Sequence, residues 1–262
     1  MAAHPPRTVN TPDGPRGMPA AAGSLANQVI LVTGGGSGLG AATCRVLAVE
    51  GARVIVADRD VERARQTVAD LEAAGSAAET LELDVGEAEA VERAIADIVA
   101  RQGRIDVVIN NAAIDVTAPL AELSVESWSR ILQTNLTGPF LLSKYAAAAM
   151  RVQGRGQIVN IVSTAARRAW PNASAYHASK YGLLGLSHAL HAELRDAGIK
   201  VSAVIAGGMR TPFLLERFPD LDPSRLQDPV NVAQAVRFVL TQPEGTVIPE
   251  VMVLPLTETS WP

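Results

Sequence analysis

Short apolar runs alternate with longer amphipathic segments along the chain from residue 28 onward. The apolar runs cover residues 28–33, 52–58, 80–85, 106–110, 157–162, 199–205 and 247–254. Helical patterns lie between them at 39–50, 60–74, 87–102, 124–150, 174–196 and 230–241, with a break expected at Gly138-Pro139. Apolar strands separated by helices are typical of a parallel sheet that is buried on both faces. The pattern therefore predicts an α/β fold, a doubly wound seven-stranded parallel sheet flanked by helices.

Residues 25–262 are interpreted as one Rossmann-type domain, because no linker rich in glycine or proline interrupts the alternation. Residues 1–24 contain five prolines and no continuous apolar run. We interpret them as a disordered or loosely packed N-terminal arm, and not as a signal peptide.

Composition narrows the classes of function. Of the 262 residues, 48% are hydrophobic, which is enough to bury a sizeable core. The net charge of −4 gives no electrostatic footprint for nucleic acid or an anionic membrane. The single cysteine, Cys44, excludes an intramolecular disulfide and suits a reducing compartment. We expect a cytoplasmic protein without nucleic-acid or membrane partners, with Cys44 as a small buried residue.

A glycine-rich motif, TGGGSGLG, follows the first predicted strand and leads into the first predicted helix at Thr33–Gly40. Glycines here allow positive φ and let the backbone approach a pyrophosphate, whose charge the helix N-terminus favours. The alternative is a glycine-rich turn without a ligand, but the strand–loop–helix context favours a dinucleotide site.

Asp58 ends the second predicted strand, 18 residues after Gly40. A carboxylate there can accept hydrogen bonds from both adenosine ribose hydroxyls and repels a 2′-phosphate, which favours NAD over NADP. Arg59 follows directly and could instead face a 2′-phosphate, so NADP stays open as the less favoured cofactor.

Tyr176 and Lys180 lie four residues apart in SAYHASKYG, so a helix would place them on one face. A tyrosine, with a reference pKa near 10, is a poor base unless a neighbouring cation favours its phenolate. Lys180 could supply that cation. Taken alone, the motif leaves an ordinary exposed helical pair as a plausible alternative.

From about residue 25 onward, the chain resembles the short-chain dehydrogenase/reductase family. The resemblance rests on motifs in the family's order and spacing: Thr33–Gly40, Asp84-Val85, Asn110–Ala113, Asn135, Ser163, Tyr176 and Lys180. It implies that Tyr176 is the general acid/base, that Ser163 orients the substrate oxygen and that Lys180 holds the nicotinamide ribose. It also implies that Asn135 holds a water linking Lys180 to solvent.

We expect a larger set of residues to contact the cofactor, on the evidence of the glycine-rich motif, Asp58 and the family resemblance. They are Gly34, Gly36, Ser37, Gly38, Leu39, Asp58, Arg59, Asp84, Val85, Asn111, Ala112, Tyr176, Lys180, Gly207, Met209 and Thr211.

Some positions depart from the family pattern. Ala113 stands where the family has glycine, and Ala206-Gly207 stands where Pro-Gly is expected. The segment 212–229, which would cover the substrate, is short, so the substrate is not readable by analogy. Arg167 and Arg168 could attract an anionic substrate but are interpreted as surface residues.

Two further patterns bear on partners. His188 and His191 lack a third residue with metal-ligand spacing, so no metal site is predicted. In the resembled family, helices equivalent to 146–150 and 174–196 pack between subunits, which implies a homo-oligomer, a dimer or a tetramer.

The sequence thus favours an NAD-dependent oxidoreductase that interconverts a secondary alcohol and a ketone. An NADP-dependent carbonyl reductase of the same fold is the first alternative. A nucleotide-sensing Rossmann protein without catalysis is the alternative from another class, and the complete set of four catalytic positions argues against it.

Overall fold

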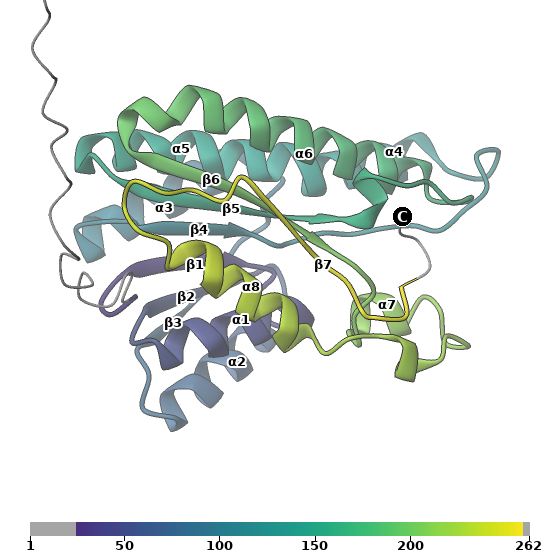
Figure 1. The fold of residues 1–262 in the computed structure, drawn as a ribbon, viewed down its shortest axis with the longest axis horizontal. Coiled ribbons are helices and arrows are strands. Elements are labelled where there is room, and N and C mark those ends of the chain that lie inside the picture. The colour runs from purple at the N-terminus through teal and green to yellow at the C-terminus, as the bar shows by residue number, and fades with distance from the viewer. Residues whose placement is uncertain (1–24, 259–262) are drawn as a thin grey trace, which may run out of the picture.

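The computed structural model describes residues 25–258 and places seven parallel strands in one sheet (Figure 1). The strands follow the order β3-β2-β1-β4-β5-β6-β7. This is the doubly wound Rossmann fold expected from the alternation of apolar runs and helices. The proposed arm, 1–24, lies outside the described residues.

The bounds of the strands are β1 Val29–Thr33, β2 Arg53–Asp58, β3 Ala78–Glu82, β4 Val107–Asn110, β5 Gly156–Ser163, β6 Ile199–Ala206 and β7 Glu250–Val253. The helices are α1 Gly38–Val49, α2 Val61–Ala73, α3 Ala88–Gln102, α4 Val125–Leu132, α5 Gly138–Gln153, α6 Ser174–Leu194, α7 Pro212–Leu215 and α8 Pro229–Leu240. None of the described helices is long and apolar enough to span a bilayer.

Helices cover both faces of the sheet, with α1, α2 and α8 on one side and α3 to α6 on the other (Figure 1). β1 shows why the central strands are mostly apolar. Ile30 and Val32 pack in the core beneath α1 and α8, whereas Val29 and Leu31 pack in the core beneath α3 and α5. Because alternate residues of a strand point to opposite faces, a strand buried on both sides has few polar positions.

One irregularity differs from the sequence expectation. The long helical segment changes at Gln133–Thr137, a single π turn between α4 and α5, and not at Gly138-Pro139. Pro139 lies in the first turn of α5, directly after the π turn, and has no N–H to donate to the carbonyls of that turn. A Cβ on Gly138 would lie 2.8 Å from a Val85 side-chain carbon, so the glycine serves close packing.

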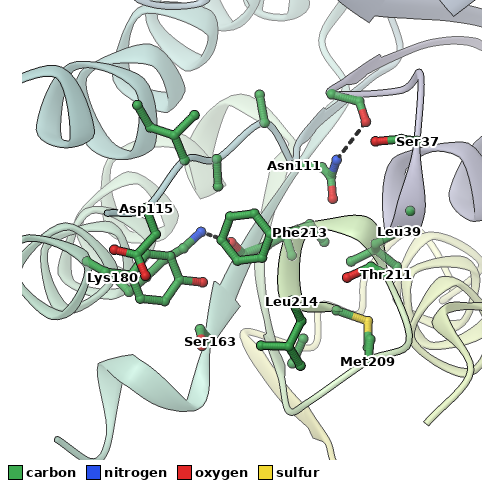
Figure 2. Close-up of a pocket in the computed structure, with 18 of the residues that line it drawn as sticks. Ser37, Leu39, Asn111, Asp115, Ser163, Lys180, Met209, Thr211, Phe213 and Leu214 are labelled. Atoms are coloured by element: carbon green, nitrogen blue, oxygen red, sulfur yellow. Dashed lines mark hydrogen bonds between the residues drawn. The ribbon is translucent and has the colours of Figure 1, made fainter. Parts of the chain in front are cut away.

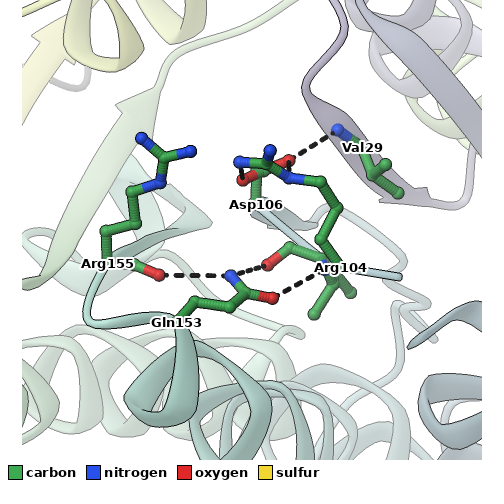
Figure 3. A network of polar contacts seen from close by, with 6 residues as sticks. Val29, Arg104, Asp106, Gln153 and Arg155 are labelled. Carbon is green, nitrogen blue, oxygen red and sulfur yellow. Dashed lines mark hydrogen bonds and ion pairs between the residues drawn. The ribbon is translucent and has the colours of Figure 1, made fainter. Parts of the chain in front are cut away.

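A polar network closes the amino-terminal ends of β1 and β4, opposite the candidate site (Figure 3). Asp106 Oδ2 accepts hydrogen bonds from the Val29 N–H at 2.9 Å and from Arg104 Nε at 2.7 Å. Gln153 bonds both backbone groups of Ile105, accepting from the N–H at 3.0 Å and donating to the C=O at 2.9 Å. The network satisfies backbone groups that would otherwise be buried without partners.

Candidate active site

A cavity of about 570 Å³ lies at the carboxyl ends of the strands, where the sheet changes winding direction between β1 and β4. Such a switch point is where open α/β sheets bind ligands. Every site residue expected from the sequence lines this cavity except Gly36 and Asn135. Glycine-loop residues and Tyr176 therefore share one space, as Figure 2 shows for Ser37, Leu39 and their neighbours.

The glycine loop has the close contacts that a phosphate cradle needs. Gly34 and Gly38 adopt φ of 62° and 51°, in the left-handed region that disfavours side chains. A Cβ on Gly40 would lie 1.9 Å from the Gly34 carbonyl oxygen, so α1 can start here only with glycine at this position. The cradle fits a dinucleotide pyrophosphate against a helix N-terminus.

Asn111 and Thr33 tie the loop to the end of β4. Asn111 Nδ2 donates to the backbone oxygens of Thr33 at 2.9 Å and Gly34 at 3.2 Å, and its side chain points toward the loop in Figure 2. Thr33 Oγ1 accepts from the N–H groups of Asn111 and Ala112 and donates to the Ile109 carbonyl oxygen. Asn111 therefore shapes the cavity as well as lining it.

Asp58 is held at the edge of the cavity by the same loop. Its Oδ2 accepts from the Gly36 N–H at 3.0 Å and its Oδ1 from the Asp60 N–H at 3.0 Å. A Cβ on Gly36 would lie 2.9 Å from Asp58 Oδ2 and 2.7 Å from the Cβ of Arg63. Gly36 thus orients Asp58 from behind, which explains why it does not line the cavity itself.

Tyr176 is buried near the start of α6, with 8% of its surface exposed. Burial raises the pKa of Tyr176 to about 12 and outweighs the lowering by the hydrogen bond with Ser163 and by the charge of Arg217. The phenol therefore keeps its proton at neutral pH. Ser163 ends β5, and its Oγ accepts from the Ala165 N–H at 3.2 Å, which fixes the hydroxyl beside the tyrosine.

Lys180 lies one turn further along α6 and is 3% exposed. Its Nζ donates to the Ile161 carbonyl oxygen at 2.9 Å and lies 5.7 Å from the Tyr176 ring centroid. Burial lowers the pKa of Lys180 to about 8. From the sequence, the lysine cation was expected to favour the phenolate, but in the structure burial is the largest influence on the pKa of both groups.

Asn135 lies in the π turn and holds the loop after β4. Its Oδ1 accepts from the Ile114 N–H at 2.8 Å, and its Nδ2 donates to the Ile114 C=O at 2.8 Å and to Ser179 Oγ at 3.1 Å. All donors of this fully buried side chain are used. A water bound to Asn135 would therefore have to donate a hydrogen bond to the Oδ1 atom.

The substrate side of the cavity was not readable from the sequence. We define the lid as residues 212–228, which follow β6 and contain α7. From the lid, Phe213, Leu214, Phe218 and Leu221 line the cavity, and the Phe213 ring lies 6.0 Å from that of Tyr176. Trp170 faces it from the loop after β5.

His177, next to the candidate tyrosine, holds the loop that carries Trp170. Its Nδ1 lies 2.8 Å from the Ala165 carbonyl oxygen and its Nε2 accepts from the Trp170 N–H at 3.1 Å. The imidazole and indole rings also meet edge to face, with centroids 4.3 Å apart. His177 therefore positions the loop between Ser163 and Trp170.

Three charged residues of the cavity were missed as well. Asp115, directly after Asn-Asn-Ala-Ala-Ile, forms a hydrogen-bonded ion pair with Arg217 of the lid. Glu258 lines the cavity near Gly208, whose N–H donates to Glu258 Oε2 at 3.2 Å. Only the position of Asp115 behind the Asn-Asn-Ala motif was a usable sequence signal.

The lid leaves and rejoins the body of the protein at one place. Met209 and Gln227 form an isolated parallel bridge, with Arg210 N–H donating to the Gln227 C=O at 2.9 Å. Gln227 Nε2 also donates to the Val253 carbonyl oxygen of β7 at 3.0 Å. Both ends of the lid are thereby anchored to the sheet.

The cavity lining does not include Arg167, Arg168, His188 or His191. Arg167 and His188 both bond Glu250 at the start of β7. Within residues 25–258, no cluster of three or more potential ligands is placed to hold a metal ion. Cys44 is fully buried, and burial raises the pKa of its thiol to about 12, so it is the inert core residue expected.

Comparison with known proteins adds the family. Residues 28–222 match the short chain dehydrogenase family. The granaticin polyketide synthase putative ketoacyl reductase 1 of Streptomyces violaceoruber is 40% identical over 73% of this chain and 71% of its own. The cyclohexanol dehydrogenase of an Acinetobacter species is 36% identical over 82% of this chain and 88% of its own. A metagenomic short-chain oxidoreductase solved in complex with NADP superimposes with a TM-score of 0.80 at 35% identity, covering 88% of this chain and 99% of that one.

Proposed function

This chain belongs to the short-chain dehydrogenase family, and on that premise we propose that Tyr176 exchanges a proton with the substrate oxygen. The protein is a nicotinamide-dependent oxidoreductase of alcohols and ketones. The observation that carries the role of Tyr176 is its place, with Ser163, in the cavity that the glycine loop also lines.

Tyr176 and Ser163 have different roles at the substrate oxygen. The nicotinamide, when bound, supplies or accepts the hydride. In ketone reduction, the neutral phenol of Tyr176 donates its proton to the oxygen on which negative charge develops. In alcohol oxidation, the phenolate form of Tyr176 takes the proton from the substrate hydroxyl. Ser163, held by the Ala165 N–H, presents its hydroxyl to that oxygen and orients it.

Lys180 and Asn135 support this proton transfer without contacting the substrate oxygen themselves. Lys180 Nζ is close enough to the Tyr176 ring for its charge to favour the phenolate, and its pKa of about 8 lets it carry that charge at neutral pH. Asn135 keeps the loop after β4 against α6 through Ile114 and Ser179. A water on Asn135 connecting Lys180 to solvent remains part of this proposal.

Substituting Tyr176 tests the proposal directly. Absorbance at 340 nm reports turnover with a panel of secondary alcohols and ketones, and Tyr176→Phe should lower kcat at least about 100-fold. Tyr181→Phe is the matched control, because Tyr181 is a half-exposed tyrosine on the same helix. If Tyr176→Phe keeps most of the activity, the proton is moved by another group.

We propose NAD as the preferred cofactor. Asp58 is fixed by the Gly36 and Asp60 N–H groups at the cavity edge, where its charge would repel a 2′-phosphate. Arg59 also lines the cavity, and the metagenomic relative was solved with NADP, so the preference needs measurement. Fluorescence titration should give tighter binding for NADH than NADPH, with Asp58→Ser narrowing the difference. Tighter binding of NADPH by the unaltered protein would overturn the assignment.

We also propose a homo-oligomer, a dimer or a tetramer, in the cytoplasm. Phe140 on α5 and Tyr181 on α6 are 44% and 49% exposed on the helical layer that covers one face of the sheet. Burying such aromatic surface is a common source of subunit association. The buried, reduced Cys44 suits a reducing compartment. Light scattering after size-exclusion chromatography measures the assembly, and a monomer would contradict it.

A further inference from the structure

The cavity extends beside Tyr176 into a substrate chamber whose walls are mostly apolar. Phe213, Leu214, Phe218 and Leu221 come from the lid and Trp170 from the loop after β5. Asp115 and Arg217 bring the charged groups into this chamber. In Figure 2, Asp115 lies on the side of the site away from Ser37 and Asn111.

The two charged side chains hold each other in one geometry. Arg217 Nη1 pairs with Asp115 Oδ2, and Arg217 Nε donates to the Phe213 carbonyl oxygen at 2.9 Å. The guanidinium lies 4.1 Å from the Phe213 ring centroid and 5.4 Å from that of Phe218. The side chain of Asp115 is 4% exposed and that of Arg217 is 20% exposed. Such a pair is rigid and largely shielded from water.

The pair leaves hydrogen-bonding capacity unused on both partners. Asp115 Oδ1 is buried and has no hydrogen bond within residues 25–258. Arg217 Nη2 likewise makes none among the described residues. Burial raises the pKa of Asp115 despite the adjacent Arg217, so the carboxylate is poorly stabilised and would gain from another donor.

This combination matches a hydroxyl group better than an ion. A hydroxyl can donate to Asp115 Oδ1 and accept from the guanidinium of Arg217 at the same time. A substrate carboxylate would meet the charge of Asp115, and a substrate ammonium would meet the charge of Arg217. Because the two charges offset each other, the chamber offers little to a net charge.

We propose that Asp115 and Arg217 form a subsite for a second hydroxyl group, so the substrate is an uncharged, largely apolar diol or hydroxyketone. One oxygen of the substrate lies at Tyr176 and Ser163, and the other lies between Asp115 and Arg217. The inference rests on the proposed function, because it needs the reacting oxygen to be placed at Tyr176.

The test compares cyclohexanol with cyclohexane-1,2-, 1,3- and 1,4-diol as substrates. The wild-type protein should show a kcat/KM for the best diol at least about tenfold above that for cyclohexanol, as expected for a hydrogen bond to a charged group. If kcat/KM for every diol isomer is less than threefold above that for cyclohexanol, the inference is overturned. Oxidation of cyclohexanol in the same assay would still support the proposed function.

The variant Asp115→Leu/Arg217→Met removes both charges together and leaves no unpaired ion, so it should fold. Its ratio of kcat/KM between the best diol and cyclohexanol should fall at least about tenfold. Asp220→Asn is the matched control, since Asp220 is an exposed acid on the same lid outside the cavity. A diol advantage that survives in the double variant would overturn the subsite.

Binding without turnover separates the two proposals. Isothermal titration of the same four compounds into the protein with NADH should show tighter binding of a diol, and the double variant should lose this advantage. Diol binding that depends on the pair, without turnover of any compound, would overturn the proposed function and keep the subsite. Equal binding of diols and cyclohexanol would overturn the subsite.

Discussion

The buried amine of Lys180 should make the stability of the ligand-free protein depend on pH. The pKa of Lys180 is about 8 in the folded protein against a reference of 10.5, and the cause is burial of a side chain that is 3% exposed. A difference of this size corresponds to about 3 kcal/mol, at roughly 1.4 kcal/mol per pKa unit. The substitution Lys180→Met isolates the contribution of this amine to the free energy of unfolding.

The direction follows from the protons that each state binds. Between pH 8 and 10.5, the unfolded chain keeps a proton on Lys180 that the folded chain has lost, so stability increases with pH. Below pH 8, both states are protonated and the cost of burying the ammonium is fully present. Above pH 10, Tyr176 acts in the opposite direction, because its pKa is raised to about 12 in the folded protein.

Urea unfolding of the ligand-free protein between pH 7 and 10 measures the effect. The free energy of unfolding of wild type, minus that of Lys180→Met, should increase by about 2–3 kcal/mol over this range. The lost hydrogen bond to Ile161 is a nearly constant offset and cancels in the trend. Lys144→Met, which removes an exposed lysine, should follow the wild-type curve. A difference that stays flat would refute the assignment of a depressed pKa to Lys180.

Three other substitutions have defined outcomes. Asp106→Asn should lower the free energy of unfolding by about 1–2 kcal/mol in urea titrations, because it removes the buried charge that pairs with the partly exposed Arg104 and accepts from the Val29 N–H; unchanged stability would show that the network is dispensable. Gly40→Ala should abolish tight NADH binding in fluorescence titrations, because its Cβ would collide with the Gly34 carbonyl oxygen. Gly185→Ala, which has open space around it, is the control. Retained binding in Gly40→Ala would contradict the argument that the glycine loop has no room for a side chain. His177→Phe should raise KM more than it lowers kcat in steady-state assays, because the loop carrying Trp170 loses two hydrogen bonds; equal changes in both would place His177 in the chemical step.

The fold was predictable because its strands are buried on both faces. The runs 28–33 and 157–162 became β1 and β5 within about a residue at each end, since a continuous apolar run has few other structures to adopt. β7 was less well defined. Only Glu250–Val253 of the expected 247–254 forms a strand, because an edge strand has one neighbour and its residues are half-buried.

The cofactor side of the site was also predictable, whereas the substrate side was not. Glycine spacing reports a backbone requirement that only glycine meets, so the positions of Gly34 and Gly38 could be assigned in advance. The pair of Asp115 and Arg217 is separated by 102 residues and follows no periodic pattern. Its existence depends on how the lid folds back over the sheet, which short-range sequence signals do not encode.

The bridge between Met209 and Gln227 joins the two ends of the lid, so the lid can be exchanged as one segment. Because the segment is clamped at its base, lengthening it adds only loop-closure entropy, about 0.6 kcal/mol for each doubling of length. Most residues of the lid can therefore diverge without disturbing the sheet. Grafting a lid from a relative onto these two anchors is thus a practical route to a new substrate range, with the strands of the sheet left unchanged.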